Sequence, residues 1–396
     1  MLALLVLLPL AASASGAGVP WNVKELQKAP RWEAASEPAE PGVKGLYYGG
    51  LPWKGKPTKV FAWYGLPERR SGKVAAMVLV HGGGGTAFAE WVRMWNRRGF
   101  AAIAMDTCGS VPEPTDPKDP WGRKKHRHQW AGPEGWGDFA SVDLPPADQW
   151  PYHAVADVIL AHSLLRSFPE IDAKRIGLTG ISWGGYLTSI VSSLDPRFAF
   201  AAPVYGCGFL GEDSAWIPTF QKMGPEKAAR WLGLWDPSNY LPLNKTPMLW
   251  VSGTNDFAYP LSSLQKSYRL ARGPRTLSIR VAMPHNQRDG AKPEEIFAMA
   301  EAMRGSGAPL ARITAQGVKD KEIWAAYKSA VPVVKAELNC TLDAGPWQPR
   351  KWQTTPARLD ARAKRASADL PAGAKACYLN LTDSRGLVVS SEHVER

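Results

Sequence analysis

The chain has 396 residues, 45% of them hydrophobic and 21% charged, so it is able to bury a large core, and disorder is excluded as its main state. The formal net charge of +12 favours contact with anionic surfaces or polymers. No nucleic-acid-binding motif accompanies this charge, so nucleic acid is not an expected partner, and the most basic run, residues 123–128, is interpreted as a solvated loop.

The first residues have the pattern of an export signal. An apolar run from Leu2 to Ala12 is followed by small residues that offer cleavage after Ala14 or Ala17, although no Lys or Arg precedes the run. The run is too short to span a bilayer, which takes about 20 apolar residues. We therefore interpret residues 1–17 as a signal peptide. The expected location is secreted or periplasmic, with no integral membrane segment after signal removal.

Short apolar runs alternate with helical patterns over much of the chain, which predicts an α/β fold, a mostly parallel sheet with helices on both faces. We expect residues 18–41 to be a loose arm, residues 42–67 to open the sheet as an antiparallel hairpin, and the whole domain to cover residues 42–306. The expected later strands are residues 74–80, 101–106, 175–181, 198–205, 247–252 and 275–281. Helices are expected over residues 88–95 and 151–165, directly after Ser182, and around residues 296–303.

The stretch between Cys108 and Trp150 has no periodicity and is rich in Pro, Gly, Trp and charge. Loops of this length in compact domains tend to be functional. Four of the 18 tryptophans fall in or beside this stretch: Trp121, Trp130, Trp136 and Trp150. Their indole faces either stack on sugar rings or fill space under the loop.

After residue 306 the apolar period changes from helical to two, which predicts a small β-sandwich over residues 307–396. Cys340 and Cys377 lie on the apolar phase of two of its strands, and in an exported domain they are expected to form a disulfide. No pairing is assigned to Cys108 and Cys207. The absence of any C-x-x-C pair gives no indication of zinc, and no metal site is expected.

Gly180-Ile181-Ser182-Trp183-Gly184 is a G-x-S-x-G motif between an expected strand and an expected helix. This context is that of a nucleophile elbow, a sharp turn that presents the serine hydroxyl at a helix N-terminus. His81 and the four glycines after it follow the strand that precedes one half of an oxyanion hole in such folds. We expect backbone N–H groups of Gly83, Gly84 and Trp183 to stabilise an oxyanion. The sequence does not show which of the two glycines donates.

A general base is found by elimination among seven histidines. Only His285 lies in a loop after a late strand, with the order serine, acid, histidine. Asp256 follows the strand 247–252 and lies 29 residues before His285, so it is the expected acid. Asp236, in a Trp-Asp-Pro-Ser sequence typical of a turn or cap, is a distant second.

These motifs together resemble the acetyl xylan esterase and dienelactone hydrolase branch of the α/β-hydrolases, which is close to the catalytic domain of prolyl oligopeptidases. The resemblance covers about residues 42–305. Dienelactone hydrolases use cysteine where this chain has Ser182, and prolyl oligopeptidases carry a long propeller for which this chain has no room.

The expected function is hydrolysis of short acyl esters, above all acetyl esters on polysaccharides such as xylan, by a Ser182-His285-Asp256 acyl-enzyme mechanism without a cofactor. One alternative is a serine peptidase of the prolyl oligopeptidase type. The other is a non-catalytic carbohydrate-binding protein that retains the triad as a relic.

Overall fold

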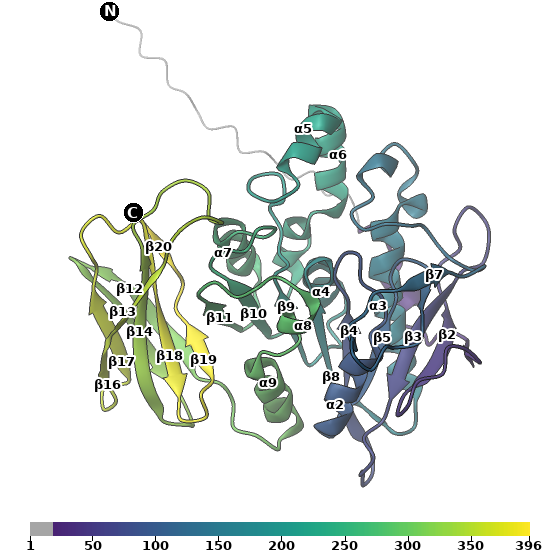
Figure 1. The fold of residues 1–396 in the computed structure, drawn as a ribbon, viewed down its shortest axis with the longest axis horizontal. Coiled ribbons are helices and arrows are strands. Elements are labelled where there is room, and N and C mark those ends of the chain that lie inside the picture. The colour runs from purple at the N-terminus through teal and green to yellow at the C-terminus, as the bar shows by residue number, and fades with distance from the viewer. Residues whose placement is uncertain (1–18) are drawn as a thin grey trace, which may run out of the picture.

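A nine-stranded sheet lies at the centre of the structure, a computed structural model that describes residues 19–396 (Figure 1). The predicted signal peptide lies outside the described residues. From one edge to the other, the strands are β1 (Trp32–Ala34), β2 (Lys44–Gly49), β3 (Lys59–Gly65), β5 (Ala101–Met105), β4 (Val74–Val80), β8 (Ile171–Ile181), β9 (Phe200–Val204), β10 (Met248–Gly253) and β11 (Arg275–Arg280).

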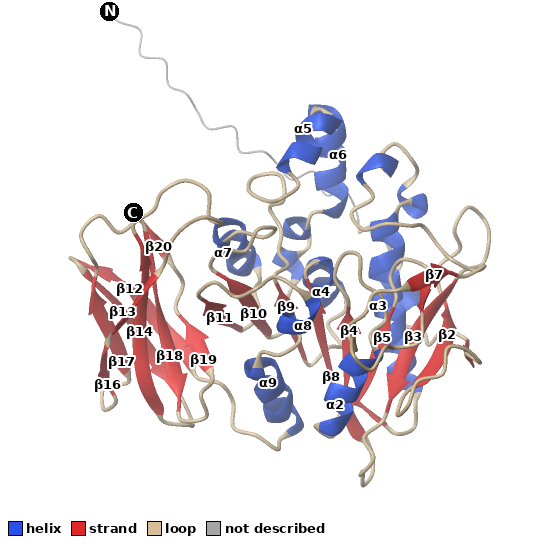
Figure 2. Cartoon of the chain, in the orientation of Figure 1, coloured by secondary structure: helices blue, strands red, loops and turns tan. Residues whose placement is uncertain are grey.

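The sheet is antiparallel from β1 to β5 and parallel from β5 to β11. All seven residues of β4 are buried, since helices cover both faces of a parallel sheet. This confirms the predicted fold class. The helices longer than four residues are α2 (Ala89–Arg97), α3 (Trp150–Ser167), α4 (Trp183–Leu194), α5 (Ile217–Met223), α6 (Pro225–Trp235), α7 (Leu261–Leu270) and α9 (Glu294–Arg304), and two of four residues are α1 (Val23–Leu26) and α8 (Gln287–Gly290). Figure 2 shows helices on both sides of the sheet, with α5 and α6 projecting beyond it.

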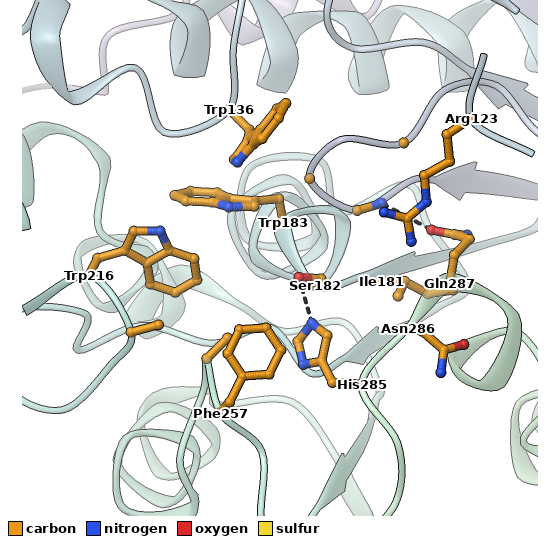
Figure 3. Close-up of a pocket in the computed structure, with 15 residues that line it drawn as sticks. Arg123, Trp136, Ile181, Ser182, Trp183, Trp216, Phe257, His285, Asn286 and Gln287 are labelled. Carbon is orange, nitrogen blue, oxygen red and sulfur yellow. Dashed lines mark hydrogen bonds between the residues drawn. The ribbon is translucent and has the colours of Figure 1, made fainter. Parts of the chain in front are cut away.

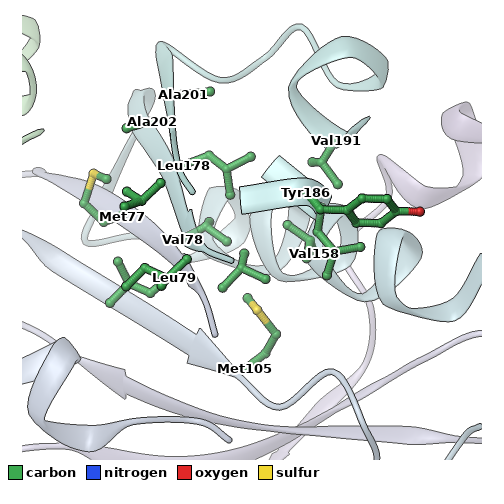
Figure 4. Close-up of a cluster of buried hydrophobic side chains, with 14 of the residues drawn as sticks. Met77, Val78, Leu79, Met105, Val158, Leu178, Tyr186, Val191, Ala201 and Ala202 are labelled. Atoms are coloured by element: carbon green, nitrogen blue, oxygen red, sulfur yellow. The ribbon is translucent and has the colours of Figure 1, made fainter. Parts of the chain in front are cut away.

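The central core lies between β4, β8 and the helices α3 and α4 (Figure 4). Leu178 and Val78 of the sheet and Val158, Tyr186 and Val191 of the helices are completely buried. Burying one such aliphatic side chain contributes about 1.5–3 kcal/mol. The strand before Ser182 and the helix after it are therefore both held in a fully buried core.

Within residues 19–41 the N-terminal arm is not loose, which corrects the expectation for this part of the chain. Strand β1 pairs with β2, and Trp21 is only 4% exposed. The indole of Trp21 donates to the carbonyl oxygen of Tyr152 at 2.8 Å and stacks on its ring. The segment was too short for a periodic pattern, and its order comes from contacts with residues far along the chain.

The stretch between Cys108 and Trp150 contains a short pair of strands that the sequence analysis did not predict. Strand β6 (Ser110–Pro112) pairs antiparallel with β7 (Lys125–Arg127), and two short 3-10 helices follow at Phe139–Ser141 and Pro146–Asp148. Two further 3-10 helices, Pro237–Asn239 and Leu241–Leu243, follow α6.

Two antiparallel sheets form the predicted C-terminal β-sandwich. One contains β12 (Arg312–Lys319), β13 (Glu322–Lys328), β17 (Arg365–Asp369) and β16 (Arg358–Asp360), and the other contains β15 (Gln353–Pro356), β14 (Val333–Thr341), β18 (Ala376–Asp383), β19 (Val388–Ser390) and β20 (Val394–Glu395). Cys340 of β14 lies opposite Cys377 of β18, and the two are joined by a disulfide. The domain boundary at residue 306 stays a prediction.

Candidate active site

Ser182 lies at the turn between β8 and α4, with a φ of +59° that places it in the left-handed region. Non-glycine residues in such conformations cluster at functional sites. The glycines around it are required by space, because a Cβ on Gly180 would lie 2.1 Å from the carbonyl oxygen of Gly184, and one on Gly184 would lie 2.0 Å from that of Val80. The G-x-S-x-G motif therefore forms the strand-turn-helix elbow that its sequence context predicts.

The three predicted triad residues lie together at the carboxyl ends of three different strands. His285 Nε2 lies 2.8 Å from the hydroxyl oxygen of Ser182 (Figure 3). Its Nδ1 lies 2.7 Å from Oδ2 of Asp256. The second oxygen of Asp256 accepts hydrogen bonds from the backbone N–H groups of Ala258 and Tyr259. A carboxylate placed in this way holds the proton on Nδ1 and leaves Nε2 free to accept the proton of the serine.

Aromatic rings that the sequence analysis did not single out surround His285. Its ring stacks on Tyr205, with centroids 4.5 Å apart, and lies 4.7 Å from Phe257. The hydroxyl of Tyr205 donates to the carbonyl oxygen of Pro284, the residue before the histidine. The only sequence signal for Tyr205 was its place as the last residue of the predicted strand 198–205, at the end of the sheet where such sites form.

The other candidate acid, Asp236, and the histidine of the glycine-rich loop, His81, have structural contacts. Asp236 accepts hydrogen bonds from the backbone N–H groups of Phe209, Leu210 and Ser238, as a capping residue does. His81 lies against the carbonyl of Gly82, and its Nε2 accepts from the N–H of Thr107.

The glycine-rich loop after β4 lies beside Ser182. Two of its N–H groups are already bonded, that of Gly82 to Oε1 of Gln287 and that of Gly85 to the carbonyl of Gly82. Those of Gly83 and Gly84 have no protein acceptor within residues 19–396. Of these two, only Gly83 lines the pocket at Ser182, and a Cβ on it would lie 2.7 Å from Trp183. This arrangement favours Gly83 with Trp183, the first residue of α4, as the oxyanion donors.

A cavity of about 330 Å³ opens in front of Ser182 and His285. Figure 3 shows that its two sides differ in chemistry. The aromatic side is formed by Trp136, Trp183, Trp216 and Phe257, and the polar side by Arg123, Asn286 and Gln287. No Asp or Glu is among the residues that line it. Within residues 19–396, no group of three His, Cys, Asp or Glu side chains is placed to hold a metal ion.

The stretch between Cys108 and Trp150 covers part of this cavity through Arg123 and Trp136. The other three tryptophans considered for sugar stacking pack elsewhere. Trp121 lies against Phe88, Trp130 against Tyr47 and Trp150 in the core against Trp183. Trp216, which also lines the cavity, was not predicted.

Parts of the chain match known protein families, and its fold matches solved structures. The acetyl xylan esterase family (AXE1) matches residues 24–212, and the prolyl oligopeptidase family matches residues 147–284. Among solved structures, an acetyl xylan esterase from Paenibacillus sp. R4 has a TM-score of 0.57 at 22% identity and covers 72% of this chain and 92% of its own. Acetyl xylan esterase 1 from Thermoanaerobacterium sp. JW/SL YS485 has a TM-score of 0.56 at 19% identity, covering 71% and 94%.

At these identities the structural likeness establishes the fold. The family matches relate the sequence to esterases and peptidases that share it, and they support a serine hydrolase acting on carboxylic esters. No helix within residues 19–396 has the length and apolar character to cross a membrane. The chain has the α/β-hydrolase fold, and parts of its sequence match the acetyl xylan esterase and prolyl oligopeptidase families.

Proposed function

We propose that the protein hydrolyses short acyl esters, acetyl esters first, carried on polysaccharides, and that it acts outside the cytoplasm after loss of residues 1–17. The observation that carries the proposal is the hydrogen-bonded chain from Ser182 through His285 to Asp256 at the mouth of a cavity. The match to the acetyl xylan esterase family supports an acetyl ester over an amide.

The proposed mechanism follows from these contacts. His285 Nε2 takes the proton of Ser182 as the serine oxygen attacks the ester carbonyl, and the oxyanion is stabilised by the N–H groups of Gly83 and Trp183. His285 then gives this proton to the leaving alcohol. Water, deprotonated by the same nitrogen, hydrolyses the acyl-enzyme and frees Ser182.

The aromatic side of the cavity favours a small acyl group. The rings of Trp183 and Trp216 lie 4.7 Å apart at 65°, and Trp183 also packs against Trp150 and Tyr186. Since these rings support one another, they leave little freedom to admit a long chain. Trp136, which is 45% exposed at the rim, presents an apolar surface to a sugar ring.

Labelling with a fluorophosphonate tests the mechanism. The wild-type enzyme should be labelled at one serine, and Ser182→Ala should remove both the label and, by about 10⁴-fold or more, the hydrolysis of p-nitrophenyl acetate. An unlabelled wild-type protein would favour the non-catalytic carbohydrate-binding alternative. Cleavage of a chromogenic dipeptide amide faster than of the acetyl ester would favour a peptidase.

A panel of acyl chain lengths tests the substrate class. A methylene that does not fit a pocket costs about 1–3 kcal/mol, so acetyl should be preferred over butyryl by about 10-fold or more. Activity that rises steadily from acetyl to octanoyl would contradict the proposal. So would the absence of acetate release from every acetylated oligosaccharide.

A further inference from the structure

The polar side of the cavity carries an unpaired positive charge. Arg123 lines the cavity together with Ser182 and His285, and within residues 19–396 its guanidinium makes no ion pair and no hydrogen bond. Arg127, four residues later, by contrast pairs with Glu134. A second cavity on the other side of Arg123 contains carboxylates, but none of them forms an ion pair with it. The guanidinium is therefore available to an anionic ligand.

The segment that carries Arg123 is fixed to the glycine-rich loop. Lys125, two residues later in β7, donates to the carbonyl oxygens of Gly84 and Gly85, and Arg127 donates to those of Cys108 and Gly132. A Cβ placed on Gly84 would lie 3.8 Å from a guanidinium nitrogen of Arg123 and 3.8 Å from the ring of Trp136. The cation thus lies beside the expected oxyanion loop.

The other polar residues add hydrogen-bond donors but no negative charge. Oε1 of Gln287 is used by the N–H of Gly82, and its Nε2 has no acceptor within the described residues. The side chain of Asn286 is bonded to Asp289 at the start of α8. A planar guanidinium with free N–H donors matches the geometry of a carboxylate better than that of a hydroxyl group.

The position of the base indicates which part of the ester would carry this carboxylate. In the proposed mechanism His285 protonates the leaving alcohol, so the alcohol lies on the side of its Nε2 atom. Asn286 and Gln287 follow His285 directly, and Figure 3 shows Arg123 on their side of the cavity, away from Trp216 and Phe257. The part of the cavity formed by Trp216 and Phe257 is then left for the acyl group.

We propose that Arg123 is a specificity-determining residue that binds a carboxylate on the alcohol part of the ester, so that the preferred substrates are acyl esters of saccharides containing uronic acids. This inference rests on the proposed esterase function. It also replaces the interpretation of residues 123–128 as only a solvated loop.

The test uses the full chain and two esters that differ in one charge, an acetylated methyl glucuronoside and its neutral primary amide. Arg123→Gln should lower kcat/KM for the acidic ester about tenfold, the lower end of what hydrogen bonds to charged groups contribute, because the side chain is exposed. The amide ester should change by less than about twofold, and Arg123→Lys should retain part of the preference.

Lys124→Gln is the matched control. It removes the same charge from the neighbouring exposed position, which does not line this cavity, and it should leave both rates nearly unchanged. Because salt screens exposed charges, about 0.5 M NaCl should weaken the acidic preference of the wild type and have no such effect on Arg123→Gln.

Other outcomes would overturn the inference. If the ratio of acidic to neutral rates is the same in wild type and Arg123→Gln, Arg123 does not select the substrate. A succinyl ester, compared with a butyryl ester, tests a carboxylate on the acyl group. If only such acidic acyl groups depend on Arg123, the residue binds the acyl part and not the alcohol part, and the inference is wrong. Hydrolysis of p-nitrophenyl acetate distinguishes a failure of this inference from a failure of the proposed esterase function. A wild-type enzyme that does not hydrolyse even this ester contradicts the proposed function itself.

Discussion

The nine-stranded sheet with its helices and the C-terminal sandwich bury their residues in different ways. In the first unit, whole strands such as β4 are buried, and the triad residues follow the carboxyl ends of β8, β10 and β11. In the sandwich, the core is smaller, strands such as β13 alternate between buried and half-buried residues, and a disulfide links its two central strands. No residue of the sandwich lines the cavity at Ser182. The active site is therefore formed by the unit with the parallel sheet, and the sandwich contributes no residue to the cavity.

The sandwich nevertheless touches the site through one loop. The side-chain amide of Asn255 donates to the carbonyl oxygens of Gln348 and Arg350 at 2.9 and 2.7 Å, and more weakly to that of Trp347. Gln348 in turn reaches the carbonyl of Phe257 at 3.4 Å. The residues on either side of Asp256 are thus tied to the sandwich, which makes the second unit a support for the position of the acid.

The largest effect is expected within the sheet unit. Asp256→Asn should lower kcat by about 10⁴-fold, because an amide no longer holds the histidine in the tautomer with the proton on Nδ1. The steady-state rate of p-nitrophenyl acetate hydrolysis by the variant and the wild type measures this fall in kcat.

Asp236→Asn is the control for this change. Its carboxylate holds three backbone N–H groups and no histidine, so the variant should lose stability but keep its turnover per folded molecule. A reversal of the two results would mean that the acid is assigned wrongly.

The second effect concerns the sandwich alone. Replacing Cys340 and Cys377 by alanine should lower the free energy of unfolding by about 2–4 kcal/mol, since the bond closes a loop of 37 residues in the unfolded chain. Denaturant unfolding with and without reductant measures the loss, and the double variant should not respond to reductant. Turnover by the folded enzyme should stay the same, and a loss of turnover at full folding would show that the sandwich acts on the site more directly.

A smaller effect is expected where the two units meet. Asn255→Ala removes two short hydrogen bonds between the acid loop and the sandwich, each contributing about 1 kcal/mol. Because the change loosens Asp256 without touching the substrate, kcat should fall about tenfold while KM stays nearly constant. Gln348→Ala, which removes only the 3.4 Å contact, should have a weaker effect in the same direction. An unchanged kcat with reduced stability would leave Asn255 a purely structural residue.

The last expected effect is a dependence of stability on pH that originates in the sheet unit. Burial lowers the pKa of His162 to about 4, although Asp195 lies 2.8 Å from its ring nitrogen and opposes the shift. In the unfolded chain the pKa of histidine is about 6.5. Between these values the unfolded state binds a proton that the folded state does not, so stability should fall as the pH is lowered from 6.5 to 4.

Thermal unfolding measured across this range should show Tm decreasing by several degrees as the pH falls. A replacement of His162 by glutamine, compared at the same pH values, should flatten that decrease, because the new side chain does not titrate. A Tm of the wild type that stays constant between pH 6.5 and 4 would contradict the assignment.

The sheet strands and their order of appearance were predictable because a buried parallel strand is a continuous apolar run, and each run stands between clear helical patterns. The short strands β1, β6 and β7 were not predictable. Each has only three residues, too few for a periodic signal, and each exists because a partner strand supplies its hydrogen bonds.

The sequence by itself determined the elbow at Ser182, since its glycines are required by contacts within a few residues of the turn and with the adjacent strand. It also indicated His285 and Asp256, through their order and their places after predicted strands. Only the tertiary structure decided what surrounds them. Trp216, Tyr205 and Arg123 come from separate segments with no shared motif, and they meet because the ends of neighbouring strands and the loops that cross them converge at one edge of the sheet.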